Sequence, residues 1–454
     1  MARTGRALVV GGGVAGLAAA VELAERFDVE VREADDRLGG KIRTSPFAGL
    51  PAVDEAADAY LLRVPHAAAF AERVGVVDTV SPTGASAMIW HDGMHPIPPD
   101  VLLGVPAAVL PFVRSRLLGP RGKFRAALEP LVPRRDPEDS LGRLIRHRFG
   151  DEVHDRLVDA LIGSIYAADT DRSSLRAVPQ LADLAAANRS LLLGGRAARR
   201  RVVASGPIFA APRAGTGALV DAAAEHLRRL GATIRIGTRV DRLERDGDGW
   251  RVDDDPFDGV VPASPARSTA PLVAPFSADL AAALGSVEHA DVVMVRIAVP
   301  PDGLPASVVE GTLRGHSGYL VPKSRQRAVT AVSFASEKWA HWRPADGGHL
   351  FRASLGRDGL PTDHLDDTAA VAAVLEDLEM HLGAAVQPRT TSVTRWSGAF
   401  PQYRPHHHRL VERIDALLPA GLDVAGASYR GIGIPACIAD GLRAARRLTT
   451  TIDD

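Results

Sequence analysis

The stretch that decides the fold is ALVVGGGVAGLAAAVELAERFDVEVREADDRLGG, residues 7–40. A short apolar run is followed by Gly11, Gly13 and Gly16, then by apolar residues at helical spacing, and then by a second apolar run. This order predicts a strand, a tight glycine turn, a helix and a second strand. Such a unit is typical of α/β domains that bind a dinucleotide.

Each part of the predicted turn has a physical role toward a nucleotide. Gly11 permits the tight turn, Gly13 lets the backbone approach a pyrophosphate, and Gly16 lets helix and strand pack closely. The helix start directs free N–H groups and the positive end of its dipole at phosphates. Glu33, at the end of the second strand, stands where an acceptor for a ribose hydroxyl is expected, and its charge argues against NADP. The turn alone does not separate NAD from FAD.

The segment DDRLGGK, residues 35–41, favours a flavin nucleotide. Its Gly-Gly pair would bring the backbone close to the flavin side of the cofactor, and Arg37 could compensate pyrophosphate charge or be a surface residue. The 454-residue chain is 46% hydrophobic with a net charge of −1, so its composition gives no indication of nucleic-acid binding. The single cysteine excludes an internal disulfide and fits a reducing compartment, and neither a secretory signal nor a membrane span is predicted.

Strand and helix patterns alternate in three separated parts of the chain. The sequence predicts an α/β fold with a discontinuous Rossmann-like nucleotide domain, an inserted mostly helical subdomain and a mixed-sheet substrate domain. The basic run RAARRR, 196–201, is interpreted as a solvated loop. The expected boundaries are 1–62, 205–265 and 413–454 for the nucleotide domain, 63–204 for the helical subdomain and 266–412 for the substrate domain.

Several stretches resemble the flavin-dependent amine oxidase superfamily and, within it, the bacterial protoporphyrinogen and coproporphyrinogen III oxidases. EADDRLGGKIRT (33–44) is shared by many flavoproteins, whereas IYAADTDRSSLRAVPQL (165–181) and AGASYRGIGIPACIADG (425–441) are far more specific, and FPQYRPHH (400–407) adds to the match. The resemblance covers nearly the whole chain. It implies an amine-oxidase type of FAD domain in which the cofactor is held non-covalently.

The resemblance also implies which residues hold FAD. The glycine turn would take the pyrophosphate, the end of the second strand the ribose, and a C-terminal turn would close over the ribityl chain and flavin ring. Two glycine-like positions of the family are alanines within DEAADA (54–59). The implied cofactor residues are Gly11, Gly12, Gly13, Val14, Ala15, Gly16, Glu33, Ala34, Arg37, Gly40, Lys41, Ala56, Ala57, Asp58, Ala59, Val240, Ala427, Ile432, Gly433 and Ile434.

The implied reaction is the six-electron oxidation of coproporphyrinogen III to coproporphyrin III in haem biosynthesis, with dioxygen reduced to hydrogen peroxide. Protoporphyrinogen IX, another substrate of the superfamily, and a non-catalytic flavin- or porphyrin-binding role remain alternatives. No catalytic residue is indicated by spacing. The substrate cavity would be lined by Ser164, Ile165, Tyr166, Tyr319 and Leu320, and Lys323, Arg404 or Arg430 could meet the substrate carboxylates or be surface charges. Ser164 and Ala168 depart from the family pattern.

Three further expectations concern metal, location and partners. Cys437 is interpreted as a buried, inert thiol, and the consecutive residues His406–His408 are not expected to bind a metal. The enzyme is expected in the cytoplasm, with peripheral membrane contact through the apolar stretch 101–118 left open. A haem-pathway enzyme such as ferrochelatase is an expected partner.

Overall fold

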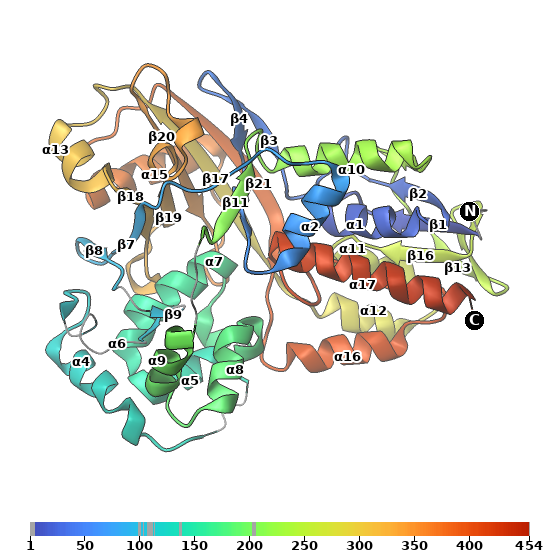
Figure 1. The fold of residues 1–454 in the computed structure, drawn as a ribbon, viewed down its shortest axis with the longest axis horizontal. Helices are drawn as coiled ribbons and strands as arrows, with labels where there is room; N and C mark the ends of the chain where they lie inside the picture. The colour runs from blue at the N-terminus through green and yellow to red at the C-terminus, as the bar shows by residue number, and fades with distance from the viewer. Residues whose placement is uncertain are drawn as a thin grey trace.

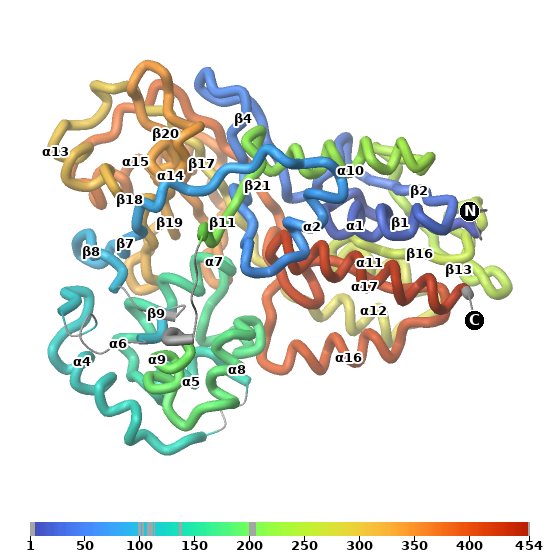
Figure 2. The backbone as a smooth tube through the Cα atoms, viewed as in Figure 1, coloured from blue at the N-terminus to red at the C-terminus, as the bar shows by residue number. Residues whose placement is uncertain are grey.

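The structure is a computed structural model, and it describes residues 5–98, 101–102, 104–106, 112, 114–135, 139–201 and 206–453. Three regions are visible in Figure 1: a sheet-and-helix region holding both termini, a large sheet at the upper left and a cluster of helices at the lower left. The backbone tube in Figure 2 shows early, middle and late segments of the chain meeting in the region of the termini. The predicted α/β class is confirmed.

The region of the termini is built on a parallel sheet in the order β12-β2-β1-β16. Its core strands are apolar and buried because helices cover them, with α1 packing against α17 and α10. The strands are β1 (Arg6–Val10), β2 (Asp28–Arg32), β12 (Thr233–Arg235) and β16 (Gly259–Pro262), and the helices are α1 (Val14–Leu23), α2 (Pro65–Val74), α10 (Gly217–Arg229) and α17 (Ile434–Asp453).

Smaller elements complete this region. A three-stranded antiparallel sheet, β13-β14-β15, and three helices form a second core against the same parallel sheet. These elements are β13 (Leu243–Asp246), β14 (Gly249–Val252), β15 (Asp255–Phe257), α11 (Ala266–Val273), α12 (Ala278–Gly285) and α16 (His407–Leu417). The packing of α11 and α12 therefore extends the region of the termini beyond residue 265.

The second region is a seven-stranded mixed sheet in the order β21-β17-β20-β19-β18-β7-β8, in which only the β18–β7 pairing is parallel. Its strands are β7 (Ser86–Trp90), β8 (Met94–Pro96), β17 (His289–Val299), β18 (His316–Leu320), β19 (Val329–Phe334), β20 (His349–Leu355) and β21 (Thr390–Pro401), and α15 (Asp367–Leu382) packs on it. The segment 86–96, expected within the helical subdomain, thus supplies two strands here.

Short elements join the two sheet regions. They are β3 (Thr44–Phe47) with β4 (Leu50–Asp54), the three-stranded set β5 (Tyr60–Leu61), β11 (Phe209–Pro212) and β6 (Thr79–Val80), and the turns α14 (Ala335–Lys338) and η7 (Ala340–Trp342). The turns α13 (Ala306–Val308) and η5 (Val309–Leu313) pack on the seven-stranded sheet at the far left of Figure 1, and η6 (Lys323–Arg325) contacts the cluster of helices. No helix among the described residues is long and apolar enough to cross a bilayer.

The third region consists of short helices around one apolar core. They are α4 (Pro120–Ala127), η1 (Glu129–Leu131), α5 (Leu141–Phe149), α6 (Asp151–Val153), the π-helix η2 (His154–Gly163), α7 (Ser164–Tyr166), η3 (Thr170–Arg172), η4 (Leu175–Ala177), α8 (Pro179–Ala187) and α9 (Leu191–Arg201), with the strand pair β9 (Val101–Leu102) and β10 (Val105–Pro106).

One local expectation in this region is wrong. The basic run 196–201 forms the second half of α9 instead of a loop. The Ser190 hydroxyl accepts a hydrogen bond from the backbone N–H of Leu193 at 3.1 Å, which caps the start of α9. Leu191 and Leu192, in the first turn of this helix, are buried. The cap and the buried turn are tertiary features that the charge pattern does not reveal.

Candidate active site

The glycine turn between β1 and α1 has the geometry of an anion cradle. Gly11 has φ 108°, and a Cβ on Gly16 would lie 2.0 Å from the carbonyl oxygen of Gly11, so both positions require glycine. A Cβ on Gly13, in contrast, would meet no atom within 4 Å. Gly13 precedes a helix whose first N–H groups have no side-chain cap. The turn therefore presents open space in front of a helix start without a side-chain cap, which suits a pyrophosphate.

Glu33 fixes the turn to the end of β2. Its Oε2 accepts from the backbone N–H of Gly12 at 2.7 Å and its Oε1 from that of Asp35 at 2.9 Å. A carboxylate offers about four acceptor positions, so each oxygen can still receive a ribose hydroxyl. Val240 is buried in the core under this same edge, and the backbone N–H of Thr238 donates to the Glu33 carbonyl oxygen at 2.8 Å.

Arg37, considered for pyrophosphate charge or as a surface residue, makes its hydrogen bonds within its own turn. Its guanidinium donates to the carbonyl oxygens of Leu38 (3.0 Å), Gly40 (2.6 Å) and Ile42 (3.1 Å), so it organises its own turn. The turn also contacts the nucleotide loop, because the N–H of Gly39 donates to the Gly12 carbonyl oxygen at 2.8 Å. Arg37 is thus a support of the predicted cofactor loop, and its donors are directed at carbonyl groups.

Lys41 has no carboxylate partner among the described residues. It lies near Cys437 and Arg267, and burial lowers the pKa of its ammonium to about 8, with Arg267 adding repulsion. A half-buried cation beside two helix N-termini, those of α1 and α17, makes this edge favourable for anionic groups of a cofactor.

The segment 54–59 is tied to both sheet regions. Asp54 accepts from the N–H and hydroxyl of Thr216 at 2.8 and 2.9 Å, and Asp58 pairs with Lys338 at 2.7 Å and Arg352 at 2.9 Å. These two cations hold the pKa of the Asp58 carboxyl well below its usual range, against the opposing effect of burial. Asp58 is therefore an ion-pair anchor between regions.

The alanines of this segment cause no backbone strain, because none of positions 54–59 has a positive φ. Alanine thus fits at the two positions where the resemblance implied glycine. Arg352 donates to the Ala56 carbonyl oxygen and Thr216 to that of Ala57 at 3.0 Å, while Ala59 packs at the edge of a small core.

The C-terminal turn lies against the start of α17. Tyr403 donates its hydroxyl to the Ala427 carbonyl oxygen at 2.6 Å and accepts from the Gly431 N–H at 2.7 Å, which braces the turn. A Cβ on Gly441 would lie 2.1 Å from the Ala15 carbonyl oxygen, so α17 packs closely on α1. The two predicted halves of the cofactor site, from opposite ends of the chain, are therefore adjacent.

The structure brings only part of the predicted substrate wall together. Tyr166 and Ile432 line one crevice with Gln402 and Tyr403, between the helical region and the C-terminal turn. Ser164 donates to the Thr330 carbonyl oxygen at 3.3 Å, and Ile165 is 50% exposed. The volume of this crevice is about 20 Å³, room for about one water molecule, so a ligand of drug size or larger must widen it.

Tyr319 is not part of this wall. It is 1% exposed, its hydroxyl lies 2.9 Å from Nδ1 of His381 on α15, and its ring packs edge-on against Phe334. The neighbouring Leu320 packs toward the helical region instead. Successive residues of a strand face opposite sides of a sheet, so the two adjacent positions could not share one wall.

The three cations considered for substrate carboxylates are already paired with protein carboxylates. Lys323 pairs with Asp169; Arg404 pairs with Asp358 and Glu288, both at 2.5 Å. Arg430 pairs with Asp415 at 2.5 Å and Asp440 at 3.0 Å. These ion pairs therefore connect different segments of the protein to one another.

The histidine trio diverges. His407 stacks on Tyr403 with ring centroids 3.9 Å apart and lies 3.1 Å from the Tyr429 carbonyl oxygen, whereas His408 faces Asp139 at 3.6 Å. Among the described residues no group of three His, Cys, Asp or Glu side chains is placed to hold a metal ion.

Sequence reasoning missed a buried ion pair that fixes the wall. Arg357 donates to both oxygens of Asp159, at 2.7 and 3.1 Å, and to the Ala168 carbonyl oxygen, while Thr170 donates to Asp159 at 2.8 Å. Asp159 lies in the π-helix η2, and Arg357 follows β20. The two residues are far apart in the chain, so no local pattern could have indicated the pair.

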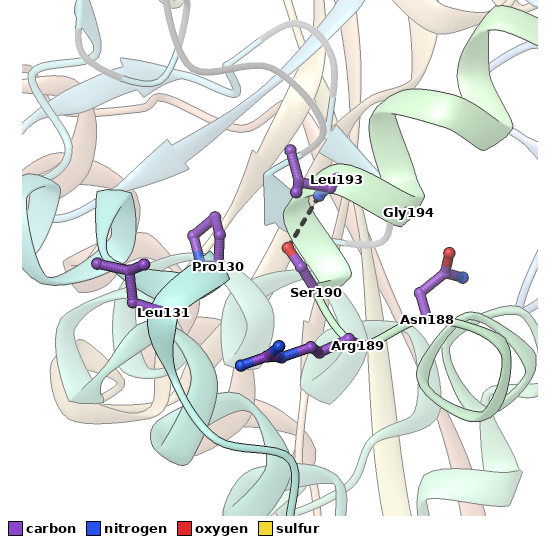
Figure 3. A pocket seen from close by; sticks show the side chains of 7 residues that line it. All are labelled: Pro130, Leu131, Asn188, Arg189, Ser190, Leu193 and Gly194. Atoms are coloured by element: carbon purple, nitrogen blue, oxygen red, sulfur yellow. Dashed lines mark hydrogen bonds between the residues drawn. The ribbon is translucent and has the colours of Figure 1, made fainter.

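A wider pocket lies away from the cofactor elements. Its volume is about 490 Å³, and it opens at the surface of the helical region between η1 and the start of α9. Figure 3 shows Leu131 and Leu193 on opposite sides of it, with Ser190 at the start of the helix. None of its lining residues belongs to the nucleotide region, so the crevice at Gln402 is the better candidate for chemistry.

Comparison with known proteins agrees with this architecture. The family model described as flavin containing amine oxidoreductase matches residues 14–449. The coproporphyrinogen III oxidases of Bacillus subtilis (strain 168) and Mycobacterium tuberculosis (strain H37Rv) are 31% and 32% identical, covering 96% and 98% of this chain and 96% and 97% of theirs. A crystal structure from Exiguobacterium sp. 255-15, classed with the protoporphyrinogen oxidases, has a TM-score of 0.87 at 26% identity and covers 100% of both chains.

The chain therefore belongs to the flavin-containing amine oxidoreductase family, and it is a flavin-dependent oxidoreductase. Cyclohexylamine oxidase from Brevibacterium oxydans, at 17% identity and a TM-score of 0.68 over 99% of this chain and 100% of its own, shares the fold alone. The resemblance seen in the sequence is confirmed. The family model names no substrate. The substrate has to be inferred from the reactions of the relatives and from this chain's own residues.

Proposed function

We propose that the protein is an FAD-dependent coproporphyrinogen III oxidase. Coproporphyrinogen III would lose six electrons and six protons, three dioxygen molecules would be reduced to three hydrogen peroxide molecules, and coproporphyrin III would be released. The observation that carries this proposal is similarity along nearly the whole chain to bacterial coproporphyrinogen III oxidases, at 31–32% identity. A flavin accepts two electrons at a time as a hydride, so three cycles balance the reaction.

FAD, held without a covalent bond, is the proposed form of the cofactor. The glycine turn with its uncapped helix start suits a pyrophosphate, and Glu33 retains acceptor positions for a ribose. Lys41 would compensate anionic charge near the start of α17. Burial raises the pKa of the Cys437 thiol to about 12, so the nucleophilic thiolate that a covalent bond would require is scarce at neutral pH.

The protein's own residues would orient the tetrapyrrole and exclude water. Tyr166 and Ile432 bring the helical region and the C-terminal turn to one crevice, and Arg357 with Asp159 holds the first of these walls. The described residues that line the crevice include no carboxylate, histidine or lysine that could serve as a general base, and pyrrole protons can leave to water. The contribution of the chain is thus placement of the reacting carbon at the cofactor.

The proposal is tested by porphyrin fluorescence and peroxide release with coproporphyrinogen III and protoporphyrinogen IX in parallel. Faster turnover of coproporphyrinogen III with three peroxides per porphyrin supports it. A protein that binds FAD and oxidises only protoporphyrinogen IX, or an amine or polyene, contradicts it. Anaerobic mixing separates a non-catalytic binder, whose flavin would stay oxidised with either porphyrinogen.

A peripheral contact with anionic membrane lipid is also proposed, at a place different from the predicted stretch 101–118. Part of that stretch lies outside the described residues, and its described residues Val105, Phe112, Leu117 and Leu118 are buried. Phe124 is 69% exposed and Leu131 is 75% exposed, and with Leu128 they follow helical spacing along α4 and η1. The sequence of α4, PRGKFRAA, has three cations and no acid. An exposed apolar stripe flanked by cations is typical of interfacial helices.

Vesicle flotation tests this contact. The variant F124E/L131E should float less with phosphatidylglycerol vesicles than the wild type, whereas V77E, at an apolar residue that is 82% exposed in another region, should not. Equal flotation of the three proteins would contradict the contact.

A metal-inserting enzyme such as ferrochelatase is the proposed partner, because it acts on the class of product that this reaction releases.

A further inference from the structure

Gln402 is a buried amide at the end of β21, within the stretch FPQY. Only 3% of the residue is exposed, and its backbone N–H donates to the Glu288 carbonyl oxygen at 2.8 Å. Its side chain lines the crevice between the helical region and the C-terminal turn. The residue therefore has a fixed backbone and a side chain at the proposed place of reaction.

The orientation of this amide is set by two carbonyl groups. Nε2 of Gln402 donates to the carbonyl oxygens of Phe400 at 3.1 Å and Ala167 at 3.3 Å. A flipped amide would place its oxygen against both of these acceptors, which is unfavourable. Oε1 must therefore point away from them, and it is buried without any donor among the described residues. Such orphaned acceptors are rare in folded proteins because the oxygen loses its hydrogen bonds with water.

Three hydroxyl groups belong to the lining of the crevice, those of Tyr166, Ser173 and Tyr403, and none of them donates to this oxygen. Tyr403 gives its hydroxyl proton to the Ala427 carbonyl oxygen, and Ser173 gives its own to that of Asp169 at 2.8 Å. The rest of the wall is mainly apolar, formed by Leu141, Ile162, Ala168, Ala177, Val178, Pro401 and Ile432. An acceptor without a partner in an apolar wall is suited to a ligand that brings an N–H or O–H donor.

We propose that Oε1 of Gln402 accepts a hydrogen bond from a pyrrole N–H of the bound tetrapyrrole. This inference rests on the proposed function. Pyrrole N–H groups are the donors at the centre of an otherwise apolar ring, and Ile432 places the same crevice beside the predicted flavin turn. A porphyrinogen carries four such N–H groups and the aromatic porphyrin two, so the bond favours the substrate over the product and directs one face of the ring at the cofactor.

The test compares Q402M with a matched control. Q402M keeps the length of the side chain and removes the acceptor, so KM for coproporphyrinogen III should rise about five- to tenfold, the value of one buried hydrogen bond. Flavin content and Tm should stay close to wild type. The control is Q326M, since Gln326 also has a buried Oε1 without a donor but lies outside the crevice. Its KM should not change.

A second measurement separates a binding role from a structural one. Binding of coproporphyrin III and its N-methyl derivative to the holoenzyme is followed by fluorescence, for wild type and for Q402M. N-methylation should weaken binding to the wild type several-fold more than binding to Q402M, because the steric effect of the methyl group cancels between the proteins. Should Q402M lose flavin, Q402N, which retracts the amide, takes its place in the same comparison.

The outcomes are distinct for each claim. An unchanged KM in Q402M, or equal effects of N-methylation in both proteins, overturns the role of Gln402 while the oxidase activity stands. A wild-type holoenzyme that neither binds nor oxidises coproporphyrinogen III overturns the proposed function itself. A variant with a lower Tm and less bound flavin but an unchanged KM would identify Gln402 as a structural residue only.

Discussion

The glycine turn after β1 and the segment 163–168 beside the crevice are both predicted site walls, and they are held in opposite ways. The turn is shaped by its own glycines and by Glu33, which is near in sequence. The segment 163–168 is held by Arg357, which comes from a different region of the molecule. A cofactor wall can thus be encoded locally, whereas the substrate wall depends on partners that only folding brings together.

The largest effect is expected from a substitution in the glycine turn after β1. In G16A the new Cβ would lie 2.0 Å from the Gly11 carbonyl oxygen, so the turn and the α1 packing must shift. We expect loss of flavin and destabilisation by several kcal/mol, measured by flavin absorbance and thermal unfolding. G13A is the control, since its Cβ meets nothing in the protein. It should leave the Tm of the flavin-free protein unchanged and weaken flavin binding; a normal flavin affinity in G13A would argue against the turn as the pyrophosphate site.

The next largest effect is expected in the segment 163–168, which the distant residue Arg357 holds. R357M leaves Asp159 buried without its cation, which typically costs about 3–5 kcal/mol. We expect faster proteolysis of the helical region and a lower Tm, with the flavin content of the folded fraction retained. The double variant D159L/R357M, which removes both charges, should recover much of the lost Tm. A single variant as stable as the wild type would show that the pair does not hold the wall.

An intermediate effect concerns charge at the cofactor wall. Because the pKa of Lys41 is lowered to about 8, its cation is lost as pH rises through that value. Affinity for anionic FAD should therefore fall about tenfold between pH 7 and pH 9.5 in the wild type, and K41M should bind FAD more weakly at pH 7 with little further change. Titration of flavin-free protein with FAD measures this difference. Parallel pH profiles of the two proteins would exclude Lys41 as the source.

The same group has an opposite effect on the stability of the flavin-free protein. Between pH 8 and about 10.4 the unfolded chain binds a proton at Lys41 that the folded chain has released. The contribution of Lys41 to the free energy of unfolding therefore increases with pH in this window, while FAD affinity decreases. Denaturant titrations of wild type and K41M across the window check the sign.

The smallest effect is expected at one backbone position of the segment 163–168, that of Ala167. Ala167 has φ 45°, in the left-handed region that disfavours a side chain, and its carbonyl oxygen accepts from the Asp358 N–H at 2.9 Å. A167G should relieve this strain and raise the free energy of unfolding by roughly 0.5–1 kcal/mol, although glycine makes the unfolded chain more flexible. Chemical denaturation measures the change. A decrease would mean that the contacts of the methyl group outweigh the strain.

The nucleotide region was largely predictable, since strand, glycine turn and helix follow one another within residues 7–40. The partners of charged residues were not. Arg37 was considered for pyrophosphate charge or as a surface residue and organises its own turn, while Arg404 and Arg430 were considered for substrate and are paired with Asp358 and Asp440. The sequence around an arginine does not show whether its guanidinium will meet carbonyl groups of its own turn, as in Arg37, or a carboxylate from a distant segment, as in Arg404.

The sequence by itself determined the α/β class, the place of the glycine turn, and the kinship of both chain ends with flavoproteins. Glycine positions and apolar periodicity act over short distances, so they are readable without a structure. Only the tertiary structure decided that Tyr319 belongs to the sheet core, that Arg357 fixes the substrate wall, and that Gln402 keeps an acceptor without a donor. These depend on burial and on which distant groups meet, and burial sets the value of each hydrogen bond.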